Sequence, residues 1–196
     1  NSSELSKLYY TGFSLVWFVA LAISVPLILY RSEVMDLLYT DTNLDAKRVL
    51  GLLMAAYFVK STTYISGTLL TAFGRLKTMN LFMMITVVLN VMLNYFLIHQ
   101  DGISGAALAT LITQGLVAIG FILICHRNRL IELRISSYVK DLVLAIVLIP
   151  LCLVISHLAP FDIWYFNFAL CLSVFIPFFF LFNFVRIKNI IREKWL

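Results

Sequence analysis

The amino-acid sequence predicts an all-α membrane protein with six transmembrane helices. Of the 196 residues, 62% are hydrophobic and only 13% are charged, whereas soluble domains carry about 25% charged residues. The apolar residues form six stretches, each near the ~20 residues that a helix needs to cross a bilayer core. Because backbone groups in lipid need partners within their own segment, such stretches must be helices. The expected spans are Leu8–Tyr30, Val49–Ala72, Thr78–Ile98, Gly102–Cys125, Leu142–Phe161 and Ile163–Val185.

The basic residues are divided unequally between the two sets of loops. If the N-terminus lies inside, eleven of the fifteen Lys and Arg residues are cytoplasmic, three are external and one lies within a span. This distribution follows the positive-inside rule, so both ends of the chain are expected in the cytoplasm. The net charge of +5 therefore needs no nucleic-acid partner to explain it. The expected cytoplasmic set is Lys7, Arg75, Lys77, Arg127, Arg129, Arg134, Lys140, Arg186, Lys188, Arg192 and Lys194.

Lys60 is the one charged residue inside the six stretches, about midway along the second. A cation at the bilayer centre costs at least ~2.5 kcal/mol, so this side chain should face water, a partner or a ligand. A polar stripe follows Lys60 at helical spacing, and no acid inside the stretches offers an ion pair. A structural ion pair with a part of the protein outside this chain is the alternative. The stripe consists of Thr63, Tyr64, Gly67 and Thr71.

Two further groups of polar residues are candidates for binding. Arg75 and Lys77 flank a short cytoplasmic turn after Gly74, a residue type that favours helix C-caps. They either meet phosphate groups or act only as topology determinants. Asn90 and Asn94 lie on one face of the third span, where each must bond to another helix or face a wet cavity.

Three segments carry other structural predictions. The external segment 31–45 has apolar residues at helical spacing, which favours a short helix on the membrane surface. The pair Gly105 and Ala109 permits close helix approach. Aromatic residues are expected as anchors at the inner interface, namely Tyr9, Tyr10, Tyr138 and Trp195.

The segment 74–110 combines a Gly-Arg-Leu-Lys turn, a Leu-Asn-Val-Met-Leu-Asn-Tyr run and Gly-Ile-Ser-Gly-Ala-Ala-Leu-Ala-Thr. This combination resembles the polysaccharide flippases of the multidrug/oligosaccharidyl-lipid/polysaccharide exporter superfamily. The resemblance covers residues 1–126, a region of four transmembrane helices, and residues 127–196 would add two more helices and a basic cytoplasmic tail. It implies that the chain is the C-terminal lobe of a MATE-like flippase, with the N-terminal lobe and two helices absent.

The resemblance implies a function in bacterial polysaccharide biosynthesis, for O-antigen, capsule or exopolysaccharide. The protein would flip an undecaprenyl-pyrophosphate-linked oligosaccharide across the cytoplasmic membrane. Its partners would be membrane lipid, the lipid-linked oligosaccharide and the missing N-terminal lobe, and no catalytic residue, metal or cofactor is expected. From their chemistry, the residues expected to meet the substrate are Lys60, Thr63, Tyr64, Asn90, Asn94, Arg75 and Lys77.

Three other functions stay open at this point. A cation-coupled drug antiporter of the same superfamily often uses an acid within the membrane, and the six stretches contain none. A membrane enzyme would need clustered acids or a His–Asp arrangement, and His99 with Asp101 is the only close pair. An assembly subunit is favoured only if the chain is complete.

Overall fold

The computed structural model describes residues 2–40, 43–132, 134–158 and 163–180, with the side chains from residue 4 onward. Within these ranges the chain is helical and contains no strand, as the composition predicts. The helices are α1 (Ser2–Leu29), α2 (Arg31–Leu38), α3 (Leu44–Ser61), α4 (Thr63–Ala72), α5 (Leu76–Arg127), α6 (Ile135–Leu158) and α7 (Trp164–Phe179).

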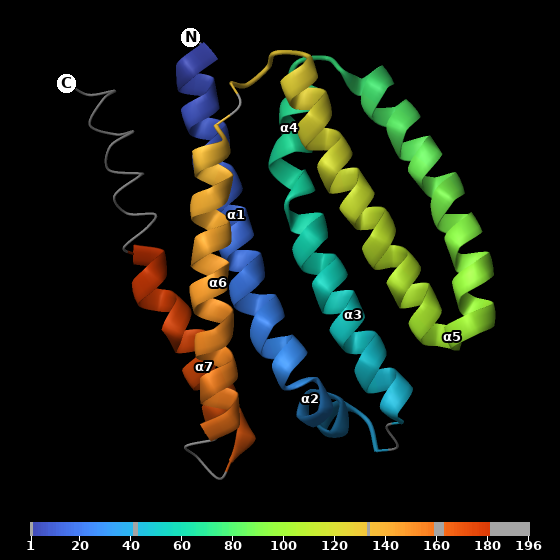
Figure 1. The fold of residues 1–196 in the computed structure, drawn as a ribbon, viewed down its shortest axis with the longest axis vertical. Coiled ribbons are helices and arrows are strands. Elements are labelled where there is room, and N and C mark those ends of the chain that lie inside the picture. Colours follow the sequence, from blue (N-terminus) through green and yellow to red (C-terminus); the bar gives the residue numbers. More distant parts are fainter. Residues whose placement is uncertain (1, 41–42, 133, 159–162, 181–196) are drawn as a thin grey trace.

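Four helical segments are long and apolar enough to cross a membrane: α1, α3 together with α4, α5 and α6. Helix α5 has 52 residues and folds back on itself at Gly102, so it forms two antiparallel arms (Figure 1). These arms correspond to the third and fourth expected spans. Helix α7 has only 16 described residues, and the rest of the sixth expected span, with the basic tail, lies outside the described residues.

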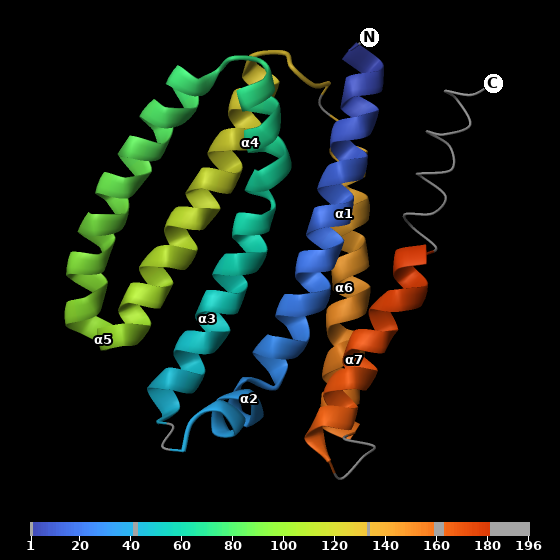
Figure 2. The ribbon, with the colours of Figure 1, turned by 180° about the vertical axis from the view of Figure 1, so that it is seen from behind.

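Helix α1 is in contact with α3, α4, α6 and α7. Helices α6 and α7 lie on one side of it, α3 and α4 on the other, and the α5 hairpin is outermost, as the front and back views show (Figures 1 and 2). The N-terminus, the α4–α5 turn and the α5–α6 loop share one end, called here the basic end (Figure 1). Seven expected cytoplasmic cations lie on these segments, namely Lys7, Arg75, Lys77, Arg127, Arg129, Arg134 and Lys140.

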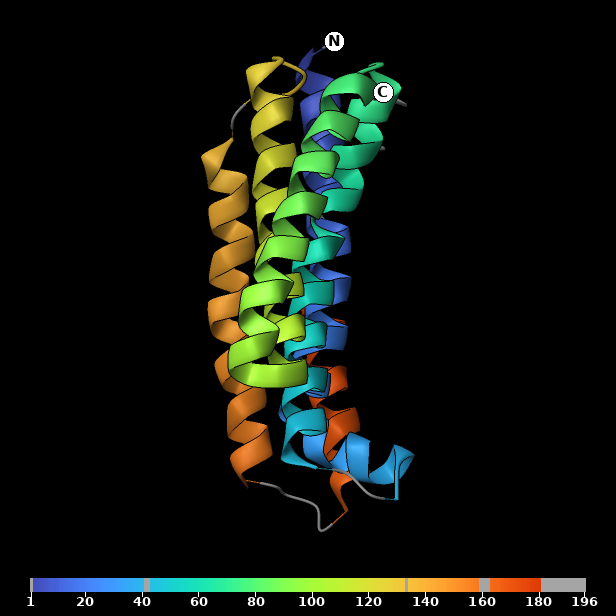
Figure 3. The same ribbon diagram turned by 90° about the vertical axis from the view of Figure 1, so that its right-hand side faces the viewer.

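Helix α2 confirms the short helix expected in the external segment. It lies across the long axis of the bundle at the far end (Figure 3). Its apolar residues Leu37 and Leu38 are exposed, and Asp36 forms a 2.8 Å ion pair with Lys47 of α3. An exposed apolar edge on a transverse helix is the arrangement of an interfacial helix.

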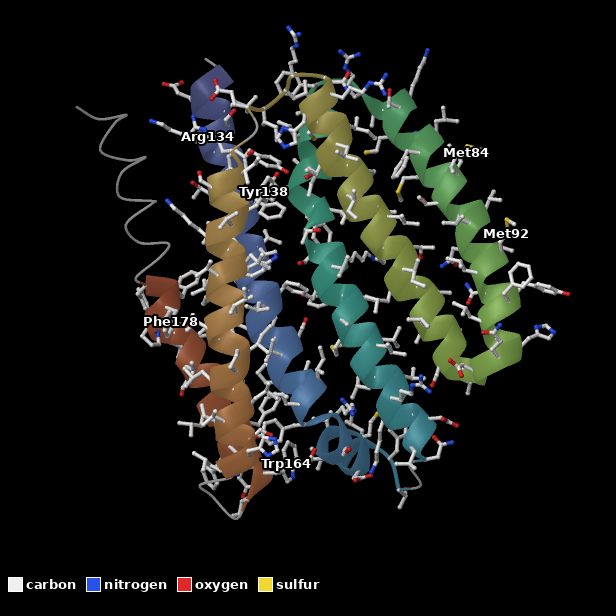
Figure 4. The ribbon with its side chains drawn as sticks, in the orientation of Figure 1. Met84, Met92, Arg134, Tyr138, Trp164 and Phe178 are labelled. Carbon is white, nitrogen blue, oxygen red and sulfur yellow. The ribbon has the colours of Figure 1, made fainter. Side chains whose placement is uncertain are left out.

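Tyr9 and Tyr10 are buried in helix contacts, which corrects the expectation that they are interface anchors. They are only 3% and 4% exposed. The Tyr9 hydroxyl lies 2.8 Å from the Ser66 hydroxyl of α4, and Tyr10 donates to the backbone carbonyl of Glu132. Tyr138 of α6 stacks edge-on against Tyr10, so these rings join α1 to its neighbours instead of facing lipid (Figure 4). Trp195 lies outside the described residues.

Glycine residues allow the tight α5 hairpin. Gly102 has φ +55° and ψ −131°, a backbone conformation that residues other than glycine rarely adopt. The helix continues through residues 99–101, which were expected to form a loop, so the reversal is confined to this glycine. Gly105 packs against the backbone carbonyl of Leu97, and Ala109 is fully buried. The close approach predicted at Gly105 is therefore present between the two arms.

Gly105→Ala should destabilise the protein, because the added Cβ would overlap the Leu97 carbonyl oxygen, which is backbone and cannot rotate away. The expected loss is about 1–3 kcal/mol, typical of overpacking, measured by thermal unfolding in detergent. Gly115→Ala is the matched control, since a Cβ there has no heavy atom within 4 Å. Equal melting of both variants would show that the arms do not pack as described.

Candidate functional site

The second expected span has a one-residue irregularity next to Lys60, at Thr62, which keeps helical angles of φ −65° and ψ −21°. Helix α3 ends at Ser61 and α4 begins at Thr63, where a continuous helix was expected. The hydroxyls of three consecutive residues donate to carbonyls three residues earlier, at 2.6 to 2.7 Å. Such side-chain bonds compete with the helical ladder and bend helices. The donors are Ser61, Thr62 and Thr63, and the acceptors are the carbonyls of Phe58, Val59 and Lys60.

An exposed stripe runs along α3 and α4, and its α4 part borders α5. Its members recur every three or four residues and are all exposed: Leu53, Tyr57, Lys60, Tyr64, Thr68 and Thr71. Lys60 lies roughly 18 Å along the helix from Ala72, at about 1.5 Å per residue. No described residue forms a hydrogen bond or an ion pair with its ammonium group. Lys60 therefore lies near the middle of the expected span, on an exposed polar surface where its positive charge has no counter-charge among the described residues.

An open cavity of about 500 Å³ lies along α4, between Lys60 and the basic end. Four of its lining residues are those predicted from the sequence to follow Lys60 as a polar stripe. Thr68 adds a hydroxyl on the same face, which was not predicted. Met79 and Phe121 come from the two arms of α5 and could not be assigned without the hairpin. The lining residues are Thr63, Tyr64, Gly67, Thr68, Thr71, Ala72, Met79 and Phe121.

The predicted C-cap at Gly74 is present and places Arg75 and Lys77. Gly74 has φ +67°. The Gly74 amide donates to the Thr71 carbonyl and the Arg75 amide to the Leu70 carbonyl, the pair of bonds of a Schellman cap. Arg75 and Lys77 are exposed just beyond the cavity, and neither has an ion-pair partner among the described residues.

Asn90 and Asn94 lie apart from this cavity, inside the α5 hairpin. The Asn90 amide donates to the Thr113 hydroxyl of the other arm at 2.9 Å, and the Asn94 amide donates to the Asn90 side chain and carbonyl. Both side chains are half-buried. Asn90 therefore makes the interhelical bond that the sequence left open as an alternative to a wet cavity, and Asn94 bonds within its own arm.

Asp141 is a buried acid that the sequence reasoning placed outside the spans. Helix α6 begins at Ile135, earlier than expected, so Asp141 lies inside it and is only 7% exposed. The Ser14 hydroxyl of α1 lies 2.8 and 2.7 Å from its two carboxylate oxygens. Asp141 is therefore a buried acid one residue before the fifth expected span; it belongs to the α1–α6 contact and does not line the cavity.

The described residues contain no group of three or more His, Cys, Asp or Glu side chains able to hold a metal ion. In comparisons with known proteins, no family model and no curated protein matches this chain. The site must therefore be interpreted from its own geometry.

The bond between Asn90 and Thr113 should hold the arms of α5 together. In a double-mutant cycle of Asn90→Ala and Thr113→Val, we expect a coupling energy of about 0.6 kcal/mol, up to ~1.7, as for hydrogen bonds between membrane helices. Thermal unfolding of the four proteins measures it. Asn80→Ala is the control, because Asn80 is exposed on the same arm. A coupling energy of zero would contradict the claim that the hydrogen bond between Asn90 and Thr113 stabilises the hairpin.

Proposed function

We propose that this chain forms part of a transporter that flips an undecaprenyl-pyrophosphate-linked oligosaccharide across the bacterial cytoplasmic membrane. The observation that supports it most is Lys60, which lies exposed and without an ion pair among the described residues, near the middle of the helical segment Leu44–Ala72. Secondary transporters commonly bind their substrates near the bilayer midplane.

The physical requirement of the proposed reaction fits this surface. A sugar head group and a diphosphate cannot enter hydrocarbon without losing their hydration, so a wet and cationic path is needed. A lysine on the wall of such a path remains hydrated and avoids the cost of an isolated charge in lipid. The stripe on α3 and α4 offers this path, with Arg75 and Lys77 at the basic end to meet the phosphates first.

The proposed assembly explains why a polar stripe is exposed. A second lobe would face α3 and α4 across a cleft, and rocking of the lobes would open the cleft to each side in turn. The gathering of cations at the basic end, with the positive-inside rule, supports a cytoplasmic location for that end and for the N-terminus. The cytoplasmic C-terminus stays a prediction from the sequence. Asn90 and Asn94 would then support the hairpin, and a contact with substrate hydroxyls remains a prediction.

A drug antiporter is the second candidate, and Asp141 is the observation that favours it. Such coupling uses an acid within the membrane, and Asp141 is a buried acid in the second turn of α6. It bonds to Ser14 in the α1–α6 contact, however, whereas the cavity has no acid in its lining and has Lys60 and Arg75 near its two ends. A cationic drug would be repelled there. The cavity lining also contains no His or Cys that would support an enzyme or metal site.

Lys60→Ala in the full-length protein should abolish most export of surface glycan at unchanged protein level, because the positive potential for the diphosphate is lost. Lys60→Arg should retain part of it, since the charge is kept. Export is measured by glycan staining of cells that lack the native transporter gene, and membrane levels by immunoblot. Lys140→Ala, an exposed lysine on α6, is the matched control.

Normal export by Lys60→Ala at normal level would contradict the proposed role of this lysine. Loss of protein from the membrane before any loss of export would instead assign Lys60 a structural role.

A further inference from the structure

We propose that the cavity beside α4 is a subsite for a sugar ring, recognised through the hydroxyl hydrogens that the ring donates. This inference rests on the proposed function and adds which part of the substrate lies in which place. It follows from the direction of the hydrogen bonds in the lining and from the charges at the two ends of the cavity.

The three threonines of the lining have already used their hydrogens. Thr63 donates to the Lys60 carbonyl, Thr68 to the Tyr64 carbonyl and Thr71 to the Gly67 carbonyl, at 2.7 to 2.9 Å. A hydroxyl has one hydrogen to donate and two lone pairs to accept with. Each threonine therefore presents only acceptor capacity to the cavity. The Tyr64 hydroxyl, which also lines the cavity, is the one side-chain group among the described lining residues with a hydrogen left to donate.

The three threonines disfavour phosphate as the occupant, because Tyr64 alone among the described lining residues has a side-chain hydrogen to donate. Ionised phosphate oxygens are acceptors, so they would meet the lone pairs of the threonines. Ammonium groups are donors, but a cation would lie close to Lys60 and Arg75 with no acid in the lining to offset them. The hydroxyls of a sugar are neutral donors and fit both the lone pairs and the charges.

The remaining wall of the cavity suits the apolar face of a sugar ring. Phe121 and Met79 close it opposite α4. Gly67 keeps this wall close: a Cβ at this position would lie 3.4 Å from the Phe121 ring. The volume of about 500 Å³ is within the roughly 300–1,000 Å³ of small-molecule pockets. The diphosphate would then lie at a cation outside the cavity, either Lys60 or Arg75 with Lys77.

The test measures binding to the full-length protein in nanodiscs by microscale thermophoresis. The probes are undecaprenyl diphosphate carrying one hexose, sugar-free undecaprenyl diphosphate, the free hexose as its methyl glycoside, and ethidium as a cationic ligand. The variant is Thr68→Val with Thr71→Val, which removes two acceptors at nearly constant shape. Thr110→Val is the control, because Thr110 makes the same bond to a carbonyl four residues earlier outside the cavity.

We expect the double variant to bind the glycosylated lipid roughly 5-fold or more weakly, from about 1 kcal/mol per lost hydrogen bond. Its affinity for the sugar-free lipid should not change. Thr68→Ser with Thr71→Ser should restore binding, since serine keeps the acceptor oxygen. Equal weakening for both lipids, no weakening for either, or threonine-dependent binding of ethidium would each overturn the subsite.

The outcomes separate this inference from the proposed function. Tight but threonine-independent binding of the glycosylated lipid would overturn the subsite and leave the flippase proposal standing. Threonine-dependent binding of the methyl glycoside, with neither lipid bound, would support the subsite and overturn the flippase proposal.

Discussion

Polar groups within a bilayer need partners inside the protein, and this constraint governs how the helices pair. Ser14 bonds to Asp141 between α1 and α6, Tyr9 meets Ser66 between α1 and α4, and Asn90 bonds to Thr113 within α5. Because water is absent from the hydrocarbon, each of these groups would lose hydrogen bonds if its helix moved into lipid. The apolar residues of the same helices are equally at home in lipid, so polar pairs and close packing at small residues determine which helices are neighbours.

Lys60 is the exception that points to function. The face of α3 and α4 that meets α1 is packed, whereas the stripe has a lysine, two tyrosines and two threonines exposed. Met84 and Met92, on the outer arm of α5, show what a surface suited to lipid looks like, because they are apolar and point away from the bundle (Figure 4). These two surfaces of the same bundle therefore suit different media: the stripe suits water, whereas the surface around Met84 and Met92 suits hydrocarbon.

The sequence predicted what depends on composition and local spacing: apolar helices, the Gly74 cap, the short helix α2 and the polar stripe after Lys60. It could not predict the irregularity at Thr62, because each hydroxyl around it could equally bond within a regular helix. The burial of Tyr9 and Tyr10 depends on Ser66 and Glu132, which are distant in sequence. The entry of Phe121 into the cavity depends on the reversal at Gly102. The position of Asp141 within α6 depends on where that helix begins. The first turn of α6 is polar, so hydropathy alone did not reveal this start.

The central claim is that the stripe containing Lys60 faces water. Lys60→Cys in the protein reconstituted in liposomes, treated with a membrane-impermeant methanethiosulfonate, tests it against Met84→Cys at similar exposure on the lipid-facing arm. The three native cysteines are each 0% exposed, so background labelling is low. Rapid labelling at position 60 with none at position 84 is the result that the account predicts. Equal lack of reaction at both positions, in sealed and in permeabilised liposomes, would contradict it.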